Sequence, residues 1–363
     1  MLKISVIGAG RIAHAHANAF KFLTDAVLYG AYDTNHESLG AFCSHFECTP
    51  FVDDIDMIRK SDLIIVCTPN SSHFEYTSKA LVLGRKVICE KPLTNKLSDG
   101  LVLKGLDESF GGGVGYVSFN YRHNKVIKLL MEDIKSGVIG KIDHIRLEFL
   151  KGSMLTKQYI GWREKGDLEN SSGAMSDLGA HLLDLCHFFI GRDIDIGDIR
   201  FKLNTAVSSI SGEAVNVDDN SYMYARTEGG EFIEIHTSKV EQYRPHGLYI
   251  EITGNLGRLL YQTKMKGTYI RRIGGTEEVV TLQSEPLISD PEGEIYGWSD
   301  SFLYQLMDVI NCAGAVTGSI RDGLKVQSVI SVLSQKYRRE RLTKEKASLG
   351  NAEYAKELTS VGI

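Results

Sequence analysis

The stretch Lys3-Ile4-Ser5-Val6-Ile7-Gly8-Ala9-Gly10-Arg11-Ile12-Ala13 decides the fold. A short apolar run passes through two glycines into a helical pattern that continues to Phe22. Gly8 permits a tight turn, Gly10 lets a phosphate approach the backbone, and Ala13 lets the helix pack closely on the strand. The unpaired N–H groups and the dipole at a helix N-terminus favour an anion there. The stretch therefore predicts a strand–turn–helix that holds the pyrophosphate of a dinucleotide, although an ordinary glycine turn would share the pattern.

A second apolar run, Val27–Tyr32, ends at Asp33, twenty residues beyond Ala13. A carboxylate at this distance accepts the adenosine ribose hydroxyls, and it disfavours a 2′-phosphate. NAD is therefore the expected cofactor, and NADP is the less favoured alternative because Arg11 could reach a phosphate. The residues expected to bind the cofactor in this region are Gly8, Gly10, Arg11, Ile12 and Asp33.

The first third of the chain alternates short Val/Ile-rich runs with helical patterns, which predicts a doubly wound parallel sheet of the Rossmann type over residues 1–121. After Asn120 the pattern changes to successive strands and a few helices, which predicts an α+β domain over residues 122–363 with an open-faced, mainly antiparallel sheet. A long helix is expected over Ala174–Ile190. Two further helices, near Ser299–Asn311 and Arg321–Arg339, are expected to close the second domain.

The composition is that of a soluble globular protein, with 43% hydrophobic and 24% charged residues in a chain of 363. The formal net charge of −5 and the lack of a basic run argue against a nucleic-acid partner. No stretch approaches the ~18 uncharged apolar residues of a membrane span. The six cysteines show no metal-binding spacing, so we expect reduced thiols, no metal and a cytoplasmic location.

Three further motifs occur in order along the chain: Cys67-Thr68-Pro69-Asn70-Ser71-Ser72-His73, Cys89-Glu90-Lys91-Pro92-Leu93, and Ser176-Asp177-Leu178-Gly179-Ala180-His181-Leu182-Leu183-Asp184. With the glycine turn and Gly115–Arg122, they make the chain resemble the glucose–fructose oxidoreductase/inositol dehydrogenase (Gfo/Idh/MocA) family. The resemblance implies reversible hydride transfer at a ring alcohol of a sugar, sugar derivative or cyclitol. Gly161-Trp162-Arg163 and Tyr296–Phe302 are most similar to the glucose-6-phosphate 3-dehydrogenases of that family.

Oxidation of a secondary alcohol needs a proton acceptor, and histidine titrates near working pH. Lys91 follows a parallel strand at the edge where dinucleotides bind, and Asp177 and His181 are four residues apart on one expected helix face. The resemblance implies that His181 is the general acid/base, that Asp177 orients the site, and that Lys91 polarises the hydroxyl or carbonyl. Whether Lys91 is itself the base stays open, as does a surface pair of Asp177 and His181.

The resemblance also implies further cofactor contacts. Thr68, Pro69, Asn70 and His73 are expected near the nicotinamide ribose, although His73 could instead cap a helix. The remaining expected cofactor contacts are Glu90, Lys91, Asn120, Trp162 and Arg163. Asp184 is expected to be structural. Cations for a substrate phosphate could be Lys157, Arg163, Lys239, Arg244 or His246.

The expected partner is a small sugar or sugar phosphate, and a homodimer or homotetramer is expected because an exposed sheet face is usually covered. Two other functions remain open. One is the NAD-dependent glycosidase activity found in a branch of the family, and the other is a non-catalytic dinucleotide sensor.

Overall fold

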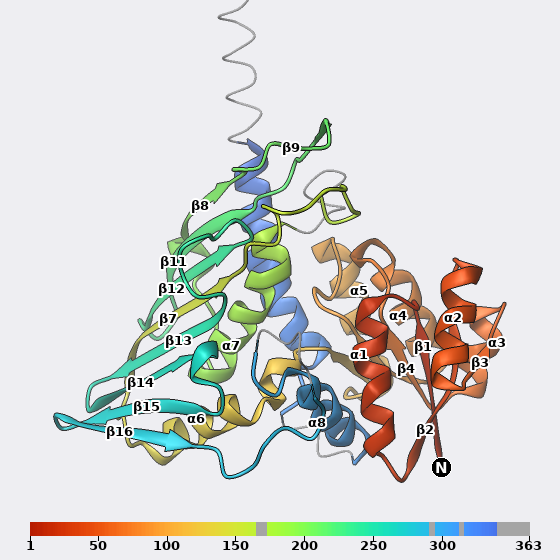
Figure 1. Cartoon of the computed structure of the whole chain (residues 1–363), viewed down its shortest axis with the longest axis horizontal. Helices are drawn as coiled ribbons and strands as arrows, with labels where there is room; N and C mark the ends of the chain where they lie inside the picture. Colours follow the sequence, from red (N-terminus) through yellow and green to blue (C-terminus); the bar gives the residue numbers. More distant parts are fainter. Residues whose placement is uncertain (165–172, 290–294, 312–315, 340–363) are drawn as a thin grey trace, which may run out of the picture.

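A computed structural model describes residues 1–164, 173–289, 295–311 and 316–339. Its first part is a six-stranded parallel sheet in the order β3-β2-β1-β4-β5-β6, which is the doubly wound order of a Rossmann domain (Figure 1). The strands are β1 (Leu2–Ile7), β2 (Ala26–Tyr32), β3 (Thr49–Pro50), β4 (Leu63–Val66), β5 (Lys86–Cys89) and β6 (Gly115–Val117). The central strand β4 is fully buried, as are the last four residues of β1, in agreement with their apolar sequences.

Helices cover both faces of this sheet. They are α1 (Arg11–Ala19), α2 (His36–Phe46), α3 (Asp54–Lys60), α4 (His73–Val82) and α5 (Leu97–Ser109). A helix from much later in the chain, α8 (Trp298–Ile310), packs against α1, and its Leu306 and Val309 join the core on that side of the sheet. We expected this helix to close the second domain. The helix also contacts residues 120–123, at the start of that domain, so it lies between the two parts, an arrangement that a one-dimensional pattern cannot foresee.

The second part contains an eight-stranded sheet in the order β16-β15-β14-β13-β7-β12-β11-β8. Its pairs are antiparallel except for β7 with β12, which run parallel. The strands are β7 (Ile142–Leu150), β8 (Arg200–Asn204), β11 (Asn220–Arg226), β12 (Phe232–Ser238), β13 (Gly247–Gly254), β14 (Gly257–Gln262), β15 (Thr268–Ile273) and β16 (Thr276–Thr281). A small ribbon of β9 (Ser209–Ile210) and β10 (Glu213–Ala214) lies apart.

One face of this sheet is packed by helices and the other is open (Figure 1). The packing helices are α6 (Lys125–Ser136), α7 (Ala180–Ile190) and the helix over residues 320–339. The fold prediction of a parallel Rossmann sheet followed by an open-faced, mainly antiparallel sheet is thus confirmed.

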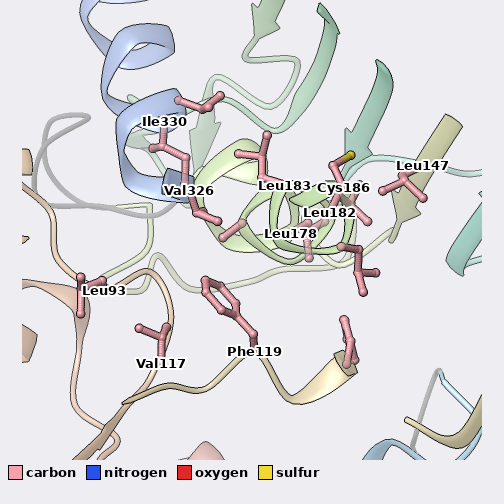
Figure 2. Packing of buried hydrophobic residues seen from close by; sticks show 14 of the residues in the cluster. Leu93, Val117, Phe119, Leu147, Leu178, Leu182, Leu183, Cys186, Val326 and Ile330 are labelled. Atoms are coloured by element: carbon pink, nitrogen blue, oxygen red, sulfur yellow. The ribbon is translucent and has the colours of Figure 1, made fainter. Parts of the chain in front are cut away.

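The core is continuous from the first sheet to the second. Leu93, Val117 and Phe119 lie at the edge of the Rossmann sheet and face the apolar side of α7 (Figure 2). Val326 and Ile330 of the last described helix complete the same cluster (Figure 2). The loop that follows β5 is therefore fixed against the element that begins near Asp177.

The described cysteines are free thiols. The Sγ atoms of Cys43 and Cys48 lie 3.4 Å apart, which is a contact and not a disulfide. Cys312 lies outside the described residues.

No helix among the described residues has the length and apolar character to cross a membrane. Nor do those residues contain a His/Cys/Asp/Glu cluster suited to a metal ion.

Candidate active site

The glycine turn between β1 and α1 fits a dinucleotide. Gly8 has a φ of +94°, and a Cβ there would lie 2.8 Å from the backbone carbon of Cys67, so only glycine suits this position. A Cβ on Gly10 would meet nothing within 4 Å, because the space over the start of α1 is open. Gly10 is also the N-cap of α1 and provides no side-chain cap, which leaves the first N–H groups of the helix available to phosphate.

Asp33 lies beside this turn at the end of β2. Its Oδ2 accepts a hydrogen bond from the Ala9 N–H at 2.6 Å, and its Oδ1 accepts one from the Asn35 N–H at 2.7 Å. A carboxylate has about four acceptor positions, so both oxygens can accept further hydrogen bonds. Asp33 therefore closes the turn and can also receive ribose hydroxyls, the role that the sequence predicts for it.

The loops after β4 and β5 are joined by His73. Its side chain is fully buried, with Nδ1 2.8 Å from the Pro92 carbonyl oxygen and Nε2 3.0 Å from the Thr68 carbonyl oxygen. A neutral imidazole carries one N–H, so it donates to one of these carbonyl oxygens and contacts the other, and His73 lies as a brace between the two loops. In the same loop, Thr68 Oγ1 and Asn70 Nδ2 are buried without a partner among the described residues, whereas Pro69 is exposed.

Lys91 and Asp177 form the centre of the site. The Lys91 Nζ donates to Asp177 Oδ1 and to the Asp177 backbone oxygen, both at 2.8 Å. The chain around Asp177 forms a π turn over Met175–Gly179, at the start of what the sequence predicts as one regular helix. A π turn leaves a backbone carbonyl free from the regular helical pattern, and such turns are frequent at functional sites. Here the Lys91 ammonium donates to the backbone carbonyl of Asp177, within this turn, and to the carboxylate of the same residue.

Two more cations reach the second oxygen of Asp177. Lys239 Nζ lies 3.1 Å and Arg163 Nε 3.6 Å from Asp177 Oδ2. Burial acts to raise the pKa of Asp177, but Lys239, Lys91 and Arg163 outweigh it and hold the pKa well below its ordinary value. Asp177 is therefore an anion throughout the neutral range.

Lys239 directly follows β12, and its backbone is held on both sides. The backbone N–H of Lys239 donates to the backbone carbonyl oxygen of Asp219 at 2.7 Å, and the backbone carbonyl oxygen of Lys239 accepts from the Met154 N–H at 2.9 Å. Sequence reasoning named Lys239 only as one of several cations for a phosphate and missed its contact with Asp177. Its place directly after a strand was the available signal, but the partner strand could not be read from one sequence.

His181 is the second residue of α7, and 9% of its surface is exposed. Its ring lies 4.4 Å from that of Tyr121 and 6.3 Å from that of Phe149, measured between centroids. Burial, Lys91 and Lys151 lower its pKa well below the ordinary value, against the opposing effect of Asp177. The imidazole is consequently neutral at pH 7 and able to accept a proton. Its Nδ1 is buried without a partner among the described residues.

Glu90 supports the site from behind. Its Oε1 lies 2.9 Å from His16 Nε2, and its Oε2 accepts the Lys91 N–H at 3.3 Å. The His16 ring packs edge-on against Phe302 of α8, at 4.6 Å between centroids. Glu90 therefore links the backbone of Lys91 to α1 and α8, and it is almost fully buried.

Two further residues that were predicted to contact the cofactor, Trp162 and Arg163, lie together. The Arg163 guanidinium is 4.3 Å from the centroid of the Trp162 indole, and Arg163 also reaches Asp177. Asn120, in contrast, is buried and donates to Ser301 Oγ at 2.7 Å.

Most of the cations that were proposed for a substrate phosphate contact other residues. Lys157 pairs with Glu164 at 2.6 Å, Arg244 contacts Glu148, and His246 contacts the backbone oxygen of Glu241 at 3.0 Å. Only Arg163 and Lys239 of that set reach Asp177.

Comparison with known proteins identifies the family. Residues 2–109 match the model of an oxidoreductase family with an NAD-binding Rossmann fold, and residues 131–341 match the C-terminal alpha/beta domain of the same family, Gfo/Idh/MocA. The chain belongs to this family. The predicted family, NAD-binding domain and dehydrogenase class are therefore confirmed.

The relatives include characterised enzymes. The chain is 32% identical to glucose-6-phosphate 3-dehydrogenase of Bacillus subtilis over 93% of this chain and 96% of that protein. It is 25% identical to myo-inositol 2-dehydrogenase of Thermotoga maritima, over 74% and 78% of the two chains. Levoglucosan dehydrogenase, solved with NADH and levoglucosan, superposes with a TM-score of 0.82 at 19% identity, covering 93% of this chain and 97% of that one.

Proposed function

We propose that the chain oxidises a ring secondary alcohol of a sugar, sugar phosphate or cyclitol with NAD, and that C3 of a hexose 6-phosphate is the first position to test. The observation that carries the proposal is the ion pair of Lys91 with Asp177 beside His181, at the edge of the sheet that holds the dinucleotide. The identity and coverage of the glucose-6-phosphate 3-dehydrogenase relative support this substrate.

The bound nicotinamide supplies the hydride acceptor. The neutral imidazole of His181 takes the hydroxyl proton as hydride leaves the carbon. The Lys91 ammonium, held by Asp177, stabilises the developing negative charge on the substrate oxygen. Lys239 and Arg163 keep Asp177 ionised, and so keep Lys91 in position.

A spectrophotometric screen tests the proposal. Inositols, hexoses, hexose 6-phosphates and nucleotide sugars are each incubated with NAD or NADP, and the absorbance of the reduced nicotinamide is followed. We expect net NADH formation with a hexose 6-phosphate and a 3-keto sugar as the product. Release of free sugar from a glycoside without net NADH would favour the glycosidase instead, and inactivity across the whole panel would favour a sensor.

We also propose that a second copy of the chain covers the open face of the eight-stranded sheet. Tyr222 and His236 stack there at 4.1 Å between centroids, and Tyr224 and Phe232 lie close to them with 39% and 38% of their surfaces exposed. A Phe232→Glu variant would place a charge in this aromatic group and should shift the protein towards monomer in light scattering, whereas Val52→Glu, on an exposed residue of the first domain, should not. A wild-type monomer would refute the proposal.

A further inference from the structure

A polar cavity of about 270 Å³ lies between the start of α5 and the helix over residues 320–339. Of the twelve described residues that line it, only Leu97 and Ile330 are apolar. Lys96 and Arg338 are basic, and none of the twelve is acidic. An empty space in a hydrophobic core would be lined by apolar side chains, so this cavity has the character of a binding site for a polar, anionic ligand.

The N-terminus of α5 forms one wall. The helix has 13 residues, its N-cap is Lys96, and no side chain caps its first N–H groups. Asp99 lies in the first turn but does not line the cavity. The helix end therefore brings uncapped N–H groups and the positive end of its dipole to this wall, and Lys96, an exposed residue, lines the cavity beside them.

Gln327 forms the opposite wall. Its side chain is 2% exposed, and its Oε1 has no hydrogen-bond partner among the described residues. Its Nε2 donates weakly to Ser331 Oγ, at 3.4 Å. Asn95 Nδ2, which also lines the cavity, is likewise buried without a partner among those residues. Buried polar groups normally have partners, and a ligand or a water molecule in the cavity would provide them for this acceptor and this donor.

We propose that this cavity binds the phosphate monoester of a polyol. The phosphate lies at the N-terminus of α5 beside Lys96, and a hydroxyl group of the ligand donates to Gln327 Oε1. The site does not depend on the proposed function. The same chemistry serves the phosphate of a sugar-phosphate substrate and that of a separate ligand, and the stoichiometry of binding separates the two.

The cavity also touches both segments that carry the central ion pair. Ser176 immediately precedes Asp177, and Thr94 follows Lys91 by three residues, with its Oγ1 bound to the Lys96 oxygen at 2.7 Å. A ligand in the cavity therefore contacts the π turn and the loop after β5 together. Occupancy would hold the two segments in the arrangement that brings Lys91 onto Asp177.

Isothermal titration calorimetry on the full chain tests the site with inorganic phosphate, glucose 6-phosphate and glucose. We expect glucose 6-phosphate to bind most tightly and glucose least. Lys96→Met should lower the affinity for inorganic phosphate and for glucose 6-phosphate about five-fold, since it removes a charge at a helix N-terminus. Gln327→Met should lower the affinity for glucose 6-phosphate to about that for inorganic phosphate, and should leave the affinity for inorganic phosphate unchanged. Lys104→Met is the matched control, because Lys104 lies on the same helix and pairs with Glu108 outside the cavity.

The folding of the variants is not at risk. Gln327→Met removes an acceptor that has no partner among the described residues and the long hydrogen bond from Nε2 to Ser331 Oγ, so its melting temperature should change little. One equivalent of glucose 6-phosphate, bound more weakly by Lys96→Met, places the only bound phosphate in the cavity, and two equivalents, of which Lys96→Met weakens one, show that the cavity is separate from a second site. Both results support the site, and neither requires turnover. Wild-type affinities in Lys96→Met and Gln327→Met, or no binding of either phosphate ligand, would overturn the proposal and leave water as the occupant.

Discussion

Lys91→Met is expected to lower kcat by about 10²- to 10⁴-fold, the range of a lost proton-transfer or charge-stabilising group. NAD affinity should change little, because the glycine turn and Asp33 are formed by β1, α1 and β2. The fold should persist as well, since Lys239 and Arg163 still reach Asp177. Steady-state NADH formation with the best substrate from the screen measures kcat, and a fluorescence titration measures NAD binding.

The pH profile adds a second readout. Burial and then Lys91 are the largest causes of the low pKa of His181, so removal of the ammonium should raise that pKa. The acidic limb of kcat/KM for the residual activity should therefore move to higher pH. Lys60→Met serves as the control, because Lys60 pairs with Asp56 on the surface. Turnover within ten-fold of wild type in Lys91→Met would contradict the role that we assign to this lysine.

The sequence predicted the parts of the fold that bury long apolar runs. The strands β1 and β2 lie within the apolar run that begins at Lys3 and the run Val27–Tyr32, give or take an end residue. The predictions did not include β3 or β16. β3 is only two residues long and both are exposed, and β16 is almost entirely exposed, so its sequence does not alternate between buried and exposed residues. The packing of α8 on α1 was also beyond reach, because a helical pattern shows which face is apolar and not which partner covers it.

The motifs named residues that the structure brings together, but they did not indicate the contacts that cross between elements. Lys91, Asp177 and His181 do lie together, and their catalytic roles remain a prediction for the Lys91→Met experiment to test. The π turn at Asp177 has no periodic signal, since five residues suffice to form it. His73 lies within a cofactor-like motif, yet its ring is buried between two loops and contacts a backbone oxygen of each. In each case a partner distant in sequence decides the role of the residue.

The second large effect is expected at Arg122, which joins three elements away from the reacting groups. Its guanidinium donates to both oxygens of Asp184 on α7, at 2.6 to 3.1 Å, and lies 3.5 Å from Asp322 of the last described helix. Asp184 is 1% exposed. Arg122→Met should cost about 3–5 kcal/mol of unfolding free energy, because it leaves a buried carboxylate without its partner.

The loss should depend on pH. Burial raises the pKa of Asp184 to about 6 even with Arg122 present, and the variant should raise it further. A carboxyl whose pKa is higher in the folded state takes up a proton on folding, so the folded state is favoured at low pH and the penalty grows as pH rises through that pKa. Urea unfolding should therefore show a smaller loss at pH 5 than at pH 8.

A double variant tests whether the cost comes from the unpaired charge. Arg122→Met with Asp184→Leu removes both ions from the interior, and should recover most of the stability, because an apolar pair of similar volume can replace a buried ion pair at little cost. Arg272→Met, which breaks an exposed pair with Glu277, should cost less than about 1 kcal/mol. Equal losses in the single and double variants would instead assign the effect to lost packing, since Arg122 also lies over the Phe188 ring at 5.3 Å. Recovery would show that the cost comes from the uncompensated charge of Asp184, and that this pair, although Asp184 lies within the family motif, can be replaced by apolar side chains without loss of the fold.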